Sequence, residues 1–309
     1  MKIYRNLSSL QRNLFDQCVL TIGKFDGIHL GHQKLLHHVI EYSKNHDIPS
    51  VVFIFYPSPV DYFSSWKTSQ RVSTFRDNMQ QLKKIGIDNV VLIRFNDDIV
   101  YLTAKEFVEK ILIEKVKLSC LVVGYDFHFG HNRLGNIDTL LTYSKKGLFQ
   151  LSCVSACRLS QEIVSSSLIK KYLKQRQLDK VNQLLGYNYY VSGKVIVGQK
   201  LGRQLGFPTA NILLKHDMIL RGVFAVQVQL EGNDELYYGI ANLGYKPTFN
   251  GQKLQLEVHI FNFSATIYTR HLSVKFVKWI RNEMKFLSIV QLQAQIKKDV
   301  DSVLHFFQL

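Results

Sequence analysis

The sequence has no hydrophobic run long enough to cross a bilayer, because its longest apolar stretches, SVVFIFY (50–56) and CLVVGYDF (120–127), have the length of single strands. Its N-terminus is polar and lacks the features of a signal peptide. There are only four cysteines, Cys18, Cys120, Cys153 and Cys157. They form no CxxC pair, and no histidine cluster has zinc-finger spacing. We therefore expect reduced thiols, a cytoplasmic location and no membrane association.

Acidic residues are in the minority, since 24 Asp and Glu residues face 39 Lys and Arg residues and leave a net charge of +15. Such an excess either attracts nucleic acid or steers anionic small molecules. The chain has no basic arm, no helix-turn-helix pattern and no aromatic strand motif of the RRM type. Its cations are spread along the chain, so we expect phosphate-bearing small molecules as partners rather than nucleic acid.

The first part of the chain, residues 1–186, alternates strand and helix patterns. Apolar runs of strand length occur at 18–23, 50–56, 89–95 and 120–127. Strands rich in Val, Ile and Leu that alternate with helices predict an α/β domain, with a parallel sheet covered by helices on both faces. Residues 165–186 are expected to be helical and to close this domain at Gly186.

The pattern changes after Gly186, where short β-branched and aromatic runs are separated by Gly and Asn. Several of these runs alternate with a period of two, which is typical of half-buried antiparallel strands. Their even spacing predicts a closed antiparallel β-barrel in a second domain, residues 187–309. An amphipathic helix over 289–307 is expected to pack on the outside of the barrel.

The segment GKFDGIHLGH (23–32) follows the first strand and opens the first helix. A helix N-terminus presents unpaired N–H groups and the positive end of the helix dipole, which suit phosphate. His29 and His32 are three residues apart, so both imidazoles can face one phosphate group. The segment is neither a Walker loop nor GxGxxG. An isolated HxxH pair would more simply be surface or capping histidines.

The segment GRQLGFPTAN (202–211) combines a glycine-rich turn with an extended stretch. Backbone N–H groups of such a turn can wrap phosphates. Thr209 and Asn211 share one face of the extended stretch, where two oxygen ligands can hold Mg²⁺ together with ATP. Glu257 lies on a polar stripe with Gln255 and His259, and by itself it would be a solvated carboxylate on a strand.

Together these strings resemble the bacterial bifunctional riboflavin kinase/FMN adenylyltransferase family. GKFDGIHLGHQ is similar to the family's GxFDGxHxGHQ segment, and GRQLGFPTAN to the GRxLGFPTAN string of riboflavin kinases. GYDFHFG (124–130) with Arg133 resembles the family's flavin-nucleotide loop, and VSSSLIK (164–170) resembles its ISSTxIR helix start. The resemblance covers nearly the whole chain in the same domain order.

The resemblance implies phosphorylation of riboflavin to FMN by the second domain and adenylylation of FMN to FAD by the first, both with ATP. It implies Glu257 as the general base of the kinase, His29 and His32 as catalytic residues of adenylyl transfer, and Thr209 and Asn211 as ligands of Mg²⁺. The implied ATP-binding residues are Gly23, Phe25, Asp26, Gly27, Gly31, Ser166, Ser167, Lys170, Gly202, Arg203, Gly206 and Phe207. The implied flavin-binding residues are Asp126, Phe127, Arg133, Arg281, Glu283 and Phe286.

The chain departs from the family pattern at Ser58, His128, Asn136, Ser167 and Lys170. One alternative is therefore a riboflavin kinase with a catalytically impaired N-terminal domain. A second alternative, suggested by the charge, is a flavin-responsive regulator that binds nucleic acid. The sequence does not indicate an oligomeric state.

Overall fold

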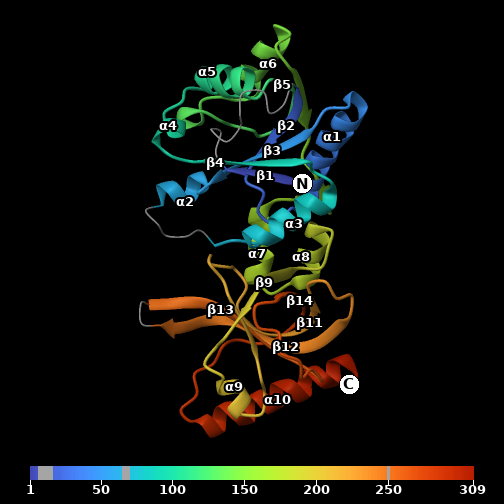
Figure 1. Ribbon diagram of the computed structural model, residues 1–309, viewed down its shortest axis with the longest axis vertical. Coiled ribbons are helices and arrows are strands. Elements are labelled where there is room, and N and C mark those ends of the chain that lie inside the picture. The colour runs from blue at the N-terminus through green and yellow to red at the C-terminus, as the bar shows by residue number, and fades with distance from the viewer. Residues whose placement is uncertain (6–16, 65–69, 249–250) are drawn as a thin grey trace. The chain divides into compact units, whose positions relative to one another are not determined.

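The structure, a computed structural model, describes residues 1–5, 17–64, 70–248 and 251–309 (Figure 1). Its contacts divide the chain into two compact units. Unit 1 comprises Met1–Ser69 with Asn78–Ser165, and unit 2 comprises Gln70–Asp77 with Ser166–Leu309. The stretch after Ser165 thus packs with the second unit, while the functional boundary expected at Gly186 stays a prediction.

Unit 1 is built on a six-stranded sheet in which every pairing is parallel. Its strands are β1 (Lys2–Arg5), β2 (Cys18–Ile22), β3 (Ser50–Tyr56), β4 (Asn89–Arg94), β5 (Leu118–Gly124) and β6 (Gln150–Val154). The order β1-β4-β3-β2-β5-β6 places β2 between β3 and β5. The segments that follow these three strands therefore leave the same edge of the sheet.

Helices connect the strands of unit 1. They are α1 (Leu30–His46), α2 (Pro59–Phe63), α3 (Phe75–Ile85, whose first turn belongs to unit 2), α4 (Asp97–Val100), α5 (Ala104–Glu106), the π-helix η2 (Phe107–Lys115), the 3₁₀ turn η3 (His131–Arg133) and α6 (Ile137–Lys145). A two-stranded hairpin, β7 (Arg158–Leu159) and β8 (Glu162–Ile163), precedes the end of the unit.

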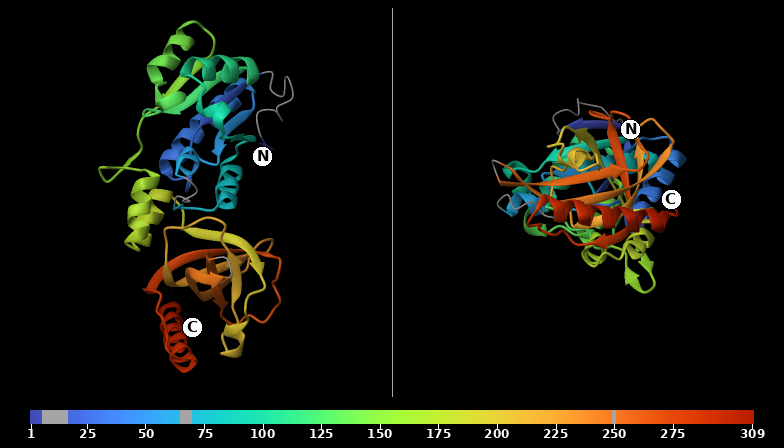
Figure 2. Two further views of the ribbon diagram at one scale, coloured as in Figure 1. Left: turned by 90° about the vertical axis from the view of Figure 1, so that its left-hand side faces the viewer. Right: turned by 90° about the horizontal axis from the view of Figure 1, so that it is seen from below.

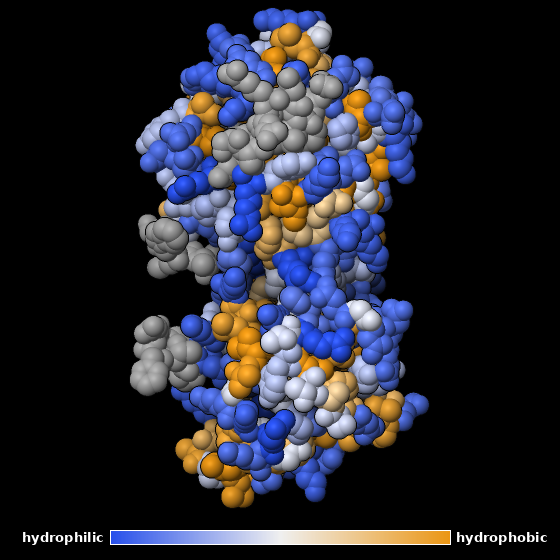
Figure 3. Space-filling model, in the orientation of Figure 1, coloured by the Kyte–Doolittle hydropathy of each residue, from blue (hydrophilic) through white to orange (hydrophobic). Residues whose placement is uncertain are grey.

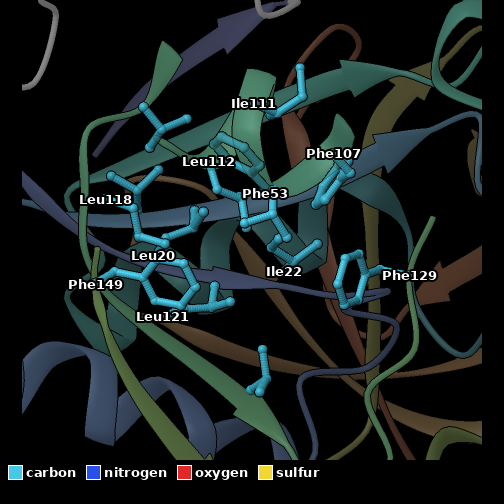
Figure 4. Packing of buried hydrophobic residues seen from close by; sticks show 14 of the residues in the cluster. Leu20, Ile22, Phe53, Phe107, Ile111, Leu112, Leu118, Leu121, Phe129 and Phe149 are labelled. Atoms are coloured by element: carbon cyan, nitrogen blue, oxygen red, sulfur yellow. The ribbon is translucent and has the colours of Figure 1, made fainter. Parts of the chain in front are cut away.

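The core of unit 1 lies between the sheet and its helices. On one face, Leu20 and Phe53 pack against Phe107 and Leu112 of η2 (Figure 4). α1 packs against β2, β3 and β5. Since successive strand residues point to opposite faces, buried residues such as Val19 lie on the side away from this cluster. Helices therefore cover both faces, and the predicted parallel α/β fold is confirmed.

The region 165–186 is helical, as predicted, and it contains two helices. It forms α7 (Ser166–Lys174) and α8 (Leu178–Leu185), which pack against each other. The chain reverses at Arg176, whose φ is 59°, and the N–H of Gln177 returns to the carbonyl of Tyr172. Two short helices let both apolar faces be buried, and no Gly or Pro marks the turn in the sequence.

Unit 2 contains a closed six-stranded barrel with only antiparallel pairings, in the order β10-β13-β12-β11-β14-β9. Its strands are β9 (Tyr190–Ile196), β10 (Ala210–Leu213), β11 (Gly222–Leu230), β12 (Leu236–Thr248), β13 (Gly251–Ile260) and β14 (His271–Arg281). Buried aromatic rings such as Phe224 and Phe276, 5.1 Å apart, contribute to its packing. The predicted barrel is confirmed.

Two helices lie at the same end of the barrel, α9 (Leu201–Gln204) and α10 (Ile289–Phe307) (Figure 2). Val300 and Val303 of α10 pack against Val223 and Ala225, which extend the apolar cluster onto the outside of the barrel. α10 has the bounds predicted from the sequence. It covers part of the outer face, where it packs against β12.

The surface of the molecule is mainly hydrophilic on the face drawn in Figure 3, with small apolar patches between the polar areas. Within the described ranges, no helix is both long enough and apolar enough to span a membrane. The four cysteines are all free thiols.

Candidate active sites

The start of α1 forms the first candidate site. β2 leads into a turn in which Gly27 has a φ of 88°, a conformation that glycine adopts without steric cost. The N–H of Gly27 donates to Oδ1 of Asn78, at 3.0 Å. Asp26 is buried beside it, with 4% of its surface exposed. The turn is thus fixed in place from α3, within unit 1.

His29 and His32 form a stacked pair at the first turn of α1. Their ring centroids are 3.7 Å apart with an angle of 17° between the planes. His29 is the N-cap, and its Nδ1 accepts the N–H of His32 at 3.3 Å. Nδ1 of His32 is buried and has no hydrogen-bond partner among the described residues. The pair therefore has an unused ring nitrogen at a helix N-terminus.

Burial keeps both rings neutral near pH 7. It lowers the pKa of His29 to about 4. Burial, and then repulsion from His29, lower the pKa of His32 well below its ordinary value. A second positive charge would be costly here unless an anion compensated it. The arrangement therefore suits a phosphate, which can accept hydrogen bonds from the rings and offset their protonation.

Close packing explains the glycines of this segment. A Cβ on Gly31 would lie 3.1 Å from Nδ1 of His29 and 3.2 Å from the carbonyl oxygen of Val164. A Cβ on Gly23 would lie 3.2 Å from the ring of Phe25, whose centroid is 5.0 Å from that of His32. The structure thus brings together the site residues predicted between 23 and 32.

Ser166, Ser167 and Lys170 lie on the first turns of α7 and belong to unit 2. Ser167 and Lys170 line a surface hollow along α7. Its other lining residues are Lys171, Lys174 and Gln175. Hydroxyls and lysines at the start of a helix are suited to phosphate, and this placement supports the predicted role of α7.

The predicted flavin loop follows β5, which neighbours β2 in the sheet. Phe127 stacks on Phe129 at 5.6 Å. Asp126 and Arg133 are exposed, and Arg133 adopts a left-handed conformation with a φ of 58°. His128, where the family has Arg, places Nδ1 2.9 Å from the carbonyl oxygen of Asp126. The loop leaves the same sheet edge as the histidine segment, which supports a shared site.

Two of the departures from the family pattern are helix caps. Ser58 is the N-cap of α2, and its Oγ accepts the N–H of Asp61 at 3.3 Å. Asn136 is the N-cap of α6, and its Oδ1 accepts the N–H of Thr139 at 3.0 Å. Ser and Asn are among the best residues for this position. A local structural role therefore accounts for both residues.

The glycine-rich segment of the barrel forms the second candidate site. A Cβ on Gly202 would overlap the carbonyl oxygen of Phe207 and lie 3.4 Å from Oγ1 of Thr209. A Cβ on Gly198 would meet the amide of Asn211 at 2.5 Å. Arg203 is exposed on α9, and Gly206 has a φ of 89°. The segment folds tightly over the start of β10, as a nucleotide-covering loop requires.

Thr209 and Asn211 offer oxygen atoms that fit Mg²⁺. Asn211 is only 6% exposed, and its Nδ2 donates to the carbonyl of Thr209 at 3.2 Å. Its Oδ1 accepts Nε2 of Gln255 at 2.6 Å. A hydroxyl and an amide oxygen are hard ligands, and the backbone of Gly198 and Gly202 packs closely against these two side chains. This donor set suits an ion bound mainly by ATP phosphates.

Glu257 lies in a row of polar side chains across three strands. In register it faces Asn211 of β10 on one side and Asn242 of β12 on the other. Its Oε2 lies 2.8 Å from Nζ of Lys246. Oδ1 of Asn242 is buried and has no hydrogen-bond partner among the described residues. The predicted base and metal ligands are therefore cross-strand neighbours.

His259, next to Glu257 on the polar stripe of β13, contacts the FPTAN segment. Nδ1 of His259 lies 2.8 Å from the carbonyl oxygen of Pro208, and its ring meets that of Phe207 edge-on at 5.7 Å. Phe207, one of the predicted nucleotide-site residues, thus sits against the same outer face of the barrel as Glu257.

The predicted flavin-side loop, 281–286, is fastened to α10. Arg281 binds Asp299 through Nε at 3.0 and 2.9 Å and through an ion pair at 2.7 Å, and Asp299 is 4% exposed. The guanidinium of Arg281 lies 5.9 Å from the ring of Phe286. A Cβ on Gly244 would overlap the carboxylate of Glu283. Arg281 therefore anchors the loop, and its contact with flavin stays a prediction.

Sequence reasoning assigned no role to Lys246, Asn242, Asn78 or Asp299. Only the folded barrel shows that the side chain of Lys246 reaches Glu257. Asn78 contacts a residue far away in the sequence, and nothing in its neighbourhood signals this.

A parallel α/β unit with a histidine pair at a helix N-terminus, and a barrel with a glycine-rich loop beside a carboxylate, define a two-site transferase that uses nucleotides. Residues 11–168 match the FAD synthetase family, and residues 185–307 match the riboflavin kinase family.

Named relatives agree over the full length. The bifunctional riboflavin kinase/FMN adenylyltransferase of Haemophilus influenzae is 38% identical over 308 residues, covering 99% of each chain. That of Escherichia coli K12 is 35% identical over 310 residues, covering 100% of this chain and 99% of the relative. A crystal structure from Streptococcus pneumoniae, described as a macrolide-efflux protein, has a TM-score of 0.78 at 27% identity, covering 96% and 97% of the two chains. The chain belongs to the bifunctional riboflavin kinase/FMN adenylyltransferase family, which confirms the resemblance seen in its motifs.

Proposed function

We propose that this enzyme makes FAD from riboflavin in two ATP-dependent steps, with phosphorylation in the barrel of unit 2 and adenylylation at the histidine pair of unit 1. The observation that carries the proposal is the cross-strand row of Asn211 and Glu257 beside the glycine-rich segment. A carboxylate next to the amide of Asn211 supports a general base beside a residue that could bind a nucleotide-bound cation. The presence of both family domains favours this two-step function over a kinase with an impaired partner domain.

In the kinase step, Glu257 accepts the proton of the ribityl 5′-hydroxyl while that oxygen attacks the γ-phosphorus of ATP. Gly202, Arg203, Gly206 and Phe207 cover the phosphates. Thr209 and Asn211 hold Mg²⁺, which neutralises phosphate charge when it is bound. The loop 281–286, anchored by Arg281 on Asp299, borders the flavin with Glu283 and Phe286.

In the adenylyl step, the phosphate of FMN attacks the α-phosphorus of ATP and pyrophosphate leaves. His29 and His32 donate hydrogen bonds to phosphate oxygens as negative charge develops. The turn containing Gly23, Phe25, Asp26, Gly27 and Gly31 lets the nucleotide approach the backbone. The hydroxyls of Ser166 and Ser167 and the cation of Lys170 bind phosphates, and Asp126, Phe127 and Arg133 border FMN.

The positive charge of the chain fits these substrates. Every ligand of the two steps except riboflavin carries phosphate, so a dispersed excess of cations raises the rate at which ligands arrive. We therefore assign the charge to small anions and not to nucleic acid. Four free thiols fit a reducing compartment, and we place the enzyme in the cytoplasm.

Two parallel incubations test the proposal. Purified protein with ATP and Mg²⁺ receives riboflavin in one reaction and FMN in the other, and the flavins are separated by chromatography. FMN from the first and FAD from the second are expected. FMN without any FAD would show an impaired adenylyl site, and the absence of both products would overturn the proposed function.

A further inference from the structure

The ion pair between Lys246 and Glu257 is the feature of the kinase site that the proposed mechanism leaves unused. Nζ of Lys246 lies 2.8 Å from Oε2 of Glu257, and the two side chains are 40% and 26% exposed. An ion pair with this exposure contributes little to stability, because water screens the charges. A contribution to stability therefore does not explain why the side chain of Lys246 lies at Glu257.

The path of the Lys246 side chain points to the reacting centre. In the β12–β13 register Lys246 faces Lys253, whereas Glu257 faces Asn242, four positions back along β12. Asn242, Gly244 and Lys246 share one face of the strand because side chains alternate. The lysine stem therefore runs back along this face, past the glycine, to bring its charge to the carboxylate.

We propose that Lys246 is a further catalytic residue of the kinase step, whose ammonium group passes from the Glu257 carboxylate to the phosphoryl group during transfer. This inference rests on the proposed riboflavin kinase function. A 5′-hydroxyl that donates to Glu257 lies about 3 Å from the carboxylate, so the ammonium group is within about 6 Å of the attacking oxygen.

The charges move in a consistent way during this step. The O5′–H bond breaks and its proton goes to Glu257, while the O5′–P bond forms. The bond between the γ-phosphorus and the bridging oxygen breaks, and ADP leaves with that electron pair. Glu257 becomes neutral and loses its attraction for Lys246, just as the phosphoryl oxygens approach. An ammonium group placed there stabilises the transferring group without any net change in charge at the site.

The test compares Lys246→Met with Lys246→Arg and with the control Lys253→Met, which removes the cross-strand lysine. Initial rates of FMN formation are measured at varied riboflavin. We expect Lys246→Met to lower kcat about 100-fold or more while KM for riboflavin changes less than about threefold, because the contact forms during transfer. Lys246→Arg recovers at least tenfold of that loss, and Lys253→Met stays within twofold of the wild type.

FAD formation from supplied FMN reports on unit 1, and an unchanged circular dichroism spectrum and Tm show that the barrel of each variant is folded. A Lys246→Met variant that makes FAD normally and retains the wild-type kcat for FMN formation would overturn the inference. So would a variant with raised kcat, which would make Lys246 a restraint on the base. If the wild-type chain itself forms no FMN, the proposed kinase function fails instead, and the two failures are thus distinguished.

Discussion

The two candidate active sites of this chain differ in the charge state of their side chains. In unit 1 the rings proposed as catalytic, His29 and His32, are neutral, and Nδ1 of His32 has no hydrogen-bond partner among the described residues. In unit 2 the carboxylate proposed as the base, Glu257, is partly exposed and forms an ion pair with Lys246. The proposed mechanism of the first site therefore uses neutral hydrogen-bonding groups. That of the second site uses an ion pair whose lysine contacts the phosphoryl group during transfer.

This difference has a structural origin. A parallel sheet covered on both faces puts its site at the strand ends, where helix N-termini and loops meet. A closed barrel has no such edge, and the proposed kinase residues Asn211 and Glu257 lie side by side on neighbouring strands of its wall. Substitutions should therefore affect the two activities separately.

The largest expected effect comes from Glu257→Gln. Removing the base should lower FMN formation about 10³-fold, within the range of general-base catalysis, and leave FAD formation from supplied FMN unchanged. Chromatographic assays of the two products measure both rates. Glu235→Gln, at an exposed position just before β12, is the matched control. Normal FMN production by Glu257→Gln would refute the base assignment.

The converse variant is His29→Ala combined with His32→Ala. It should lower FAD formation about 10³-fold through loss of both phosphate-facing rings and leave FMN formation intact. The exposed histidines of the same helix provide the control, His37→Ala with His38→Ala. If the first pair can be removed without loss of FAD synthesis, the adenylyl site lies elsewhere.

The buried histidines also make stability depend on pH. The pKa of His29 falls from 6.5 to about 4 on folding, so the unfolded chain binds more protons between these values. Stability is full above pH 6.5 and falls as the pH drops, by about 2 kcal/mol at pH 5 for His29 alone. Thermal melting at pH 7.5 and pH 5 should show a larger decrease in Tm for the wild type than for the double alanine variant. An equal decrease would contradict the neutral, buried pair.

A smaller effect is expected at Asn78, which fixes the turn before His29. Asn78→Ala removes the acceptor for the N–H of Gly27 and should slow FAD formation about tenfold, because a misplaced turn misdirects the histidines. Asn78→Asp keeps an acceptor oxygen and should recover most of the rate. FMN formation serves as the internal control. Equal rates for Ala and Asp would show that the hydrogen bond does not matter.

Sequence patterns predicted both folds because each part of the chain repeats one pattern. The first part alternates apolar strands with helices, and the second repeats short strands with a period of two. Alternating apolar runs and helices identified the parallel sheet, and α10 was found with its observed bounds. The short strand β1 and the break at Arg176 escaped prediction. β1 is only four residues long, and the break uses a non-glycine residue in a left-handed conformation. Strand β1 and the break at Arg176 depend on tertiary packing, which the local sequence does not indicate.

The site was predictable where its residues lie within one string, as His29 and His32 do. It was not predictable where contacts span the fold. Lys246 reaches Glu257 only because β12 pairs with β13, and Asp299 meets Arg281 only because α10 packs on the barrel. The strand register brings the first pair together, and the packing of α10 brings the second pair together.

The central claim is that two separate sites act in sequence through FMN, and mixing two disabled variants tests it most directly. Glu257→Gln and the His29→Ala, His32→Ala double variant are each incubated with riboflavin, ATP and Mg²⁺, alone and as an equimolar mixture. The account predicts no FAD from Glu257→Gln, FMN alone from the double variant, and FAD from the mixture. FAD from either variant alone, or a mixture that accumulates FMN without making FAD, would contradict it.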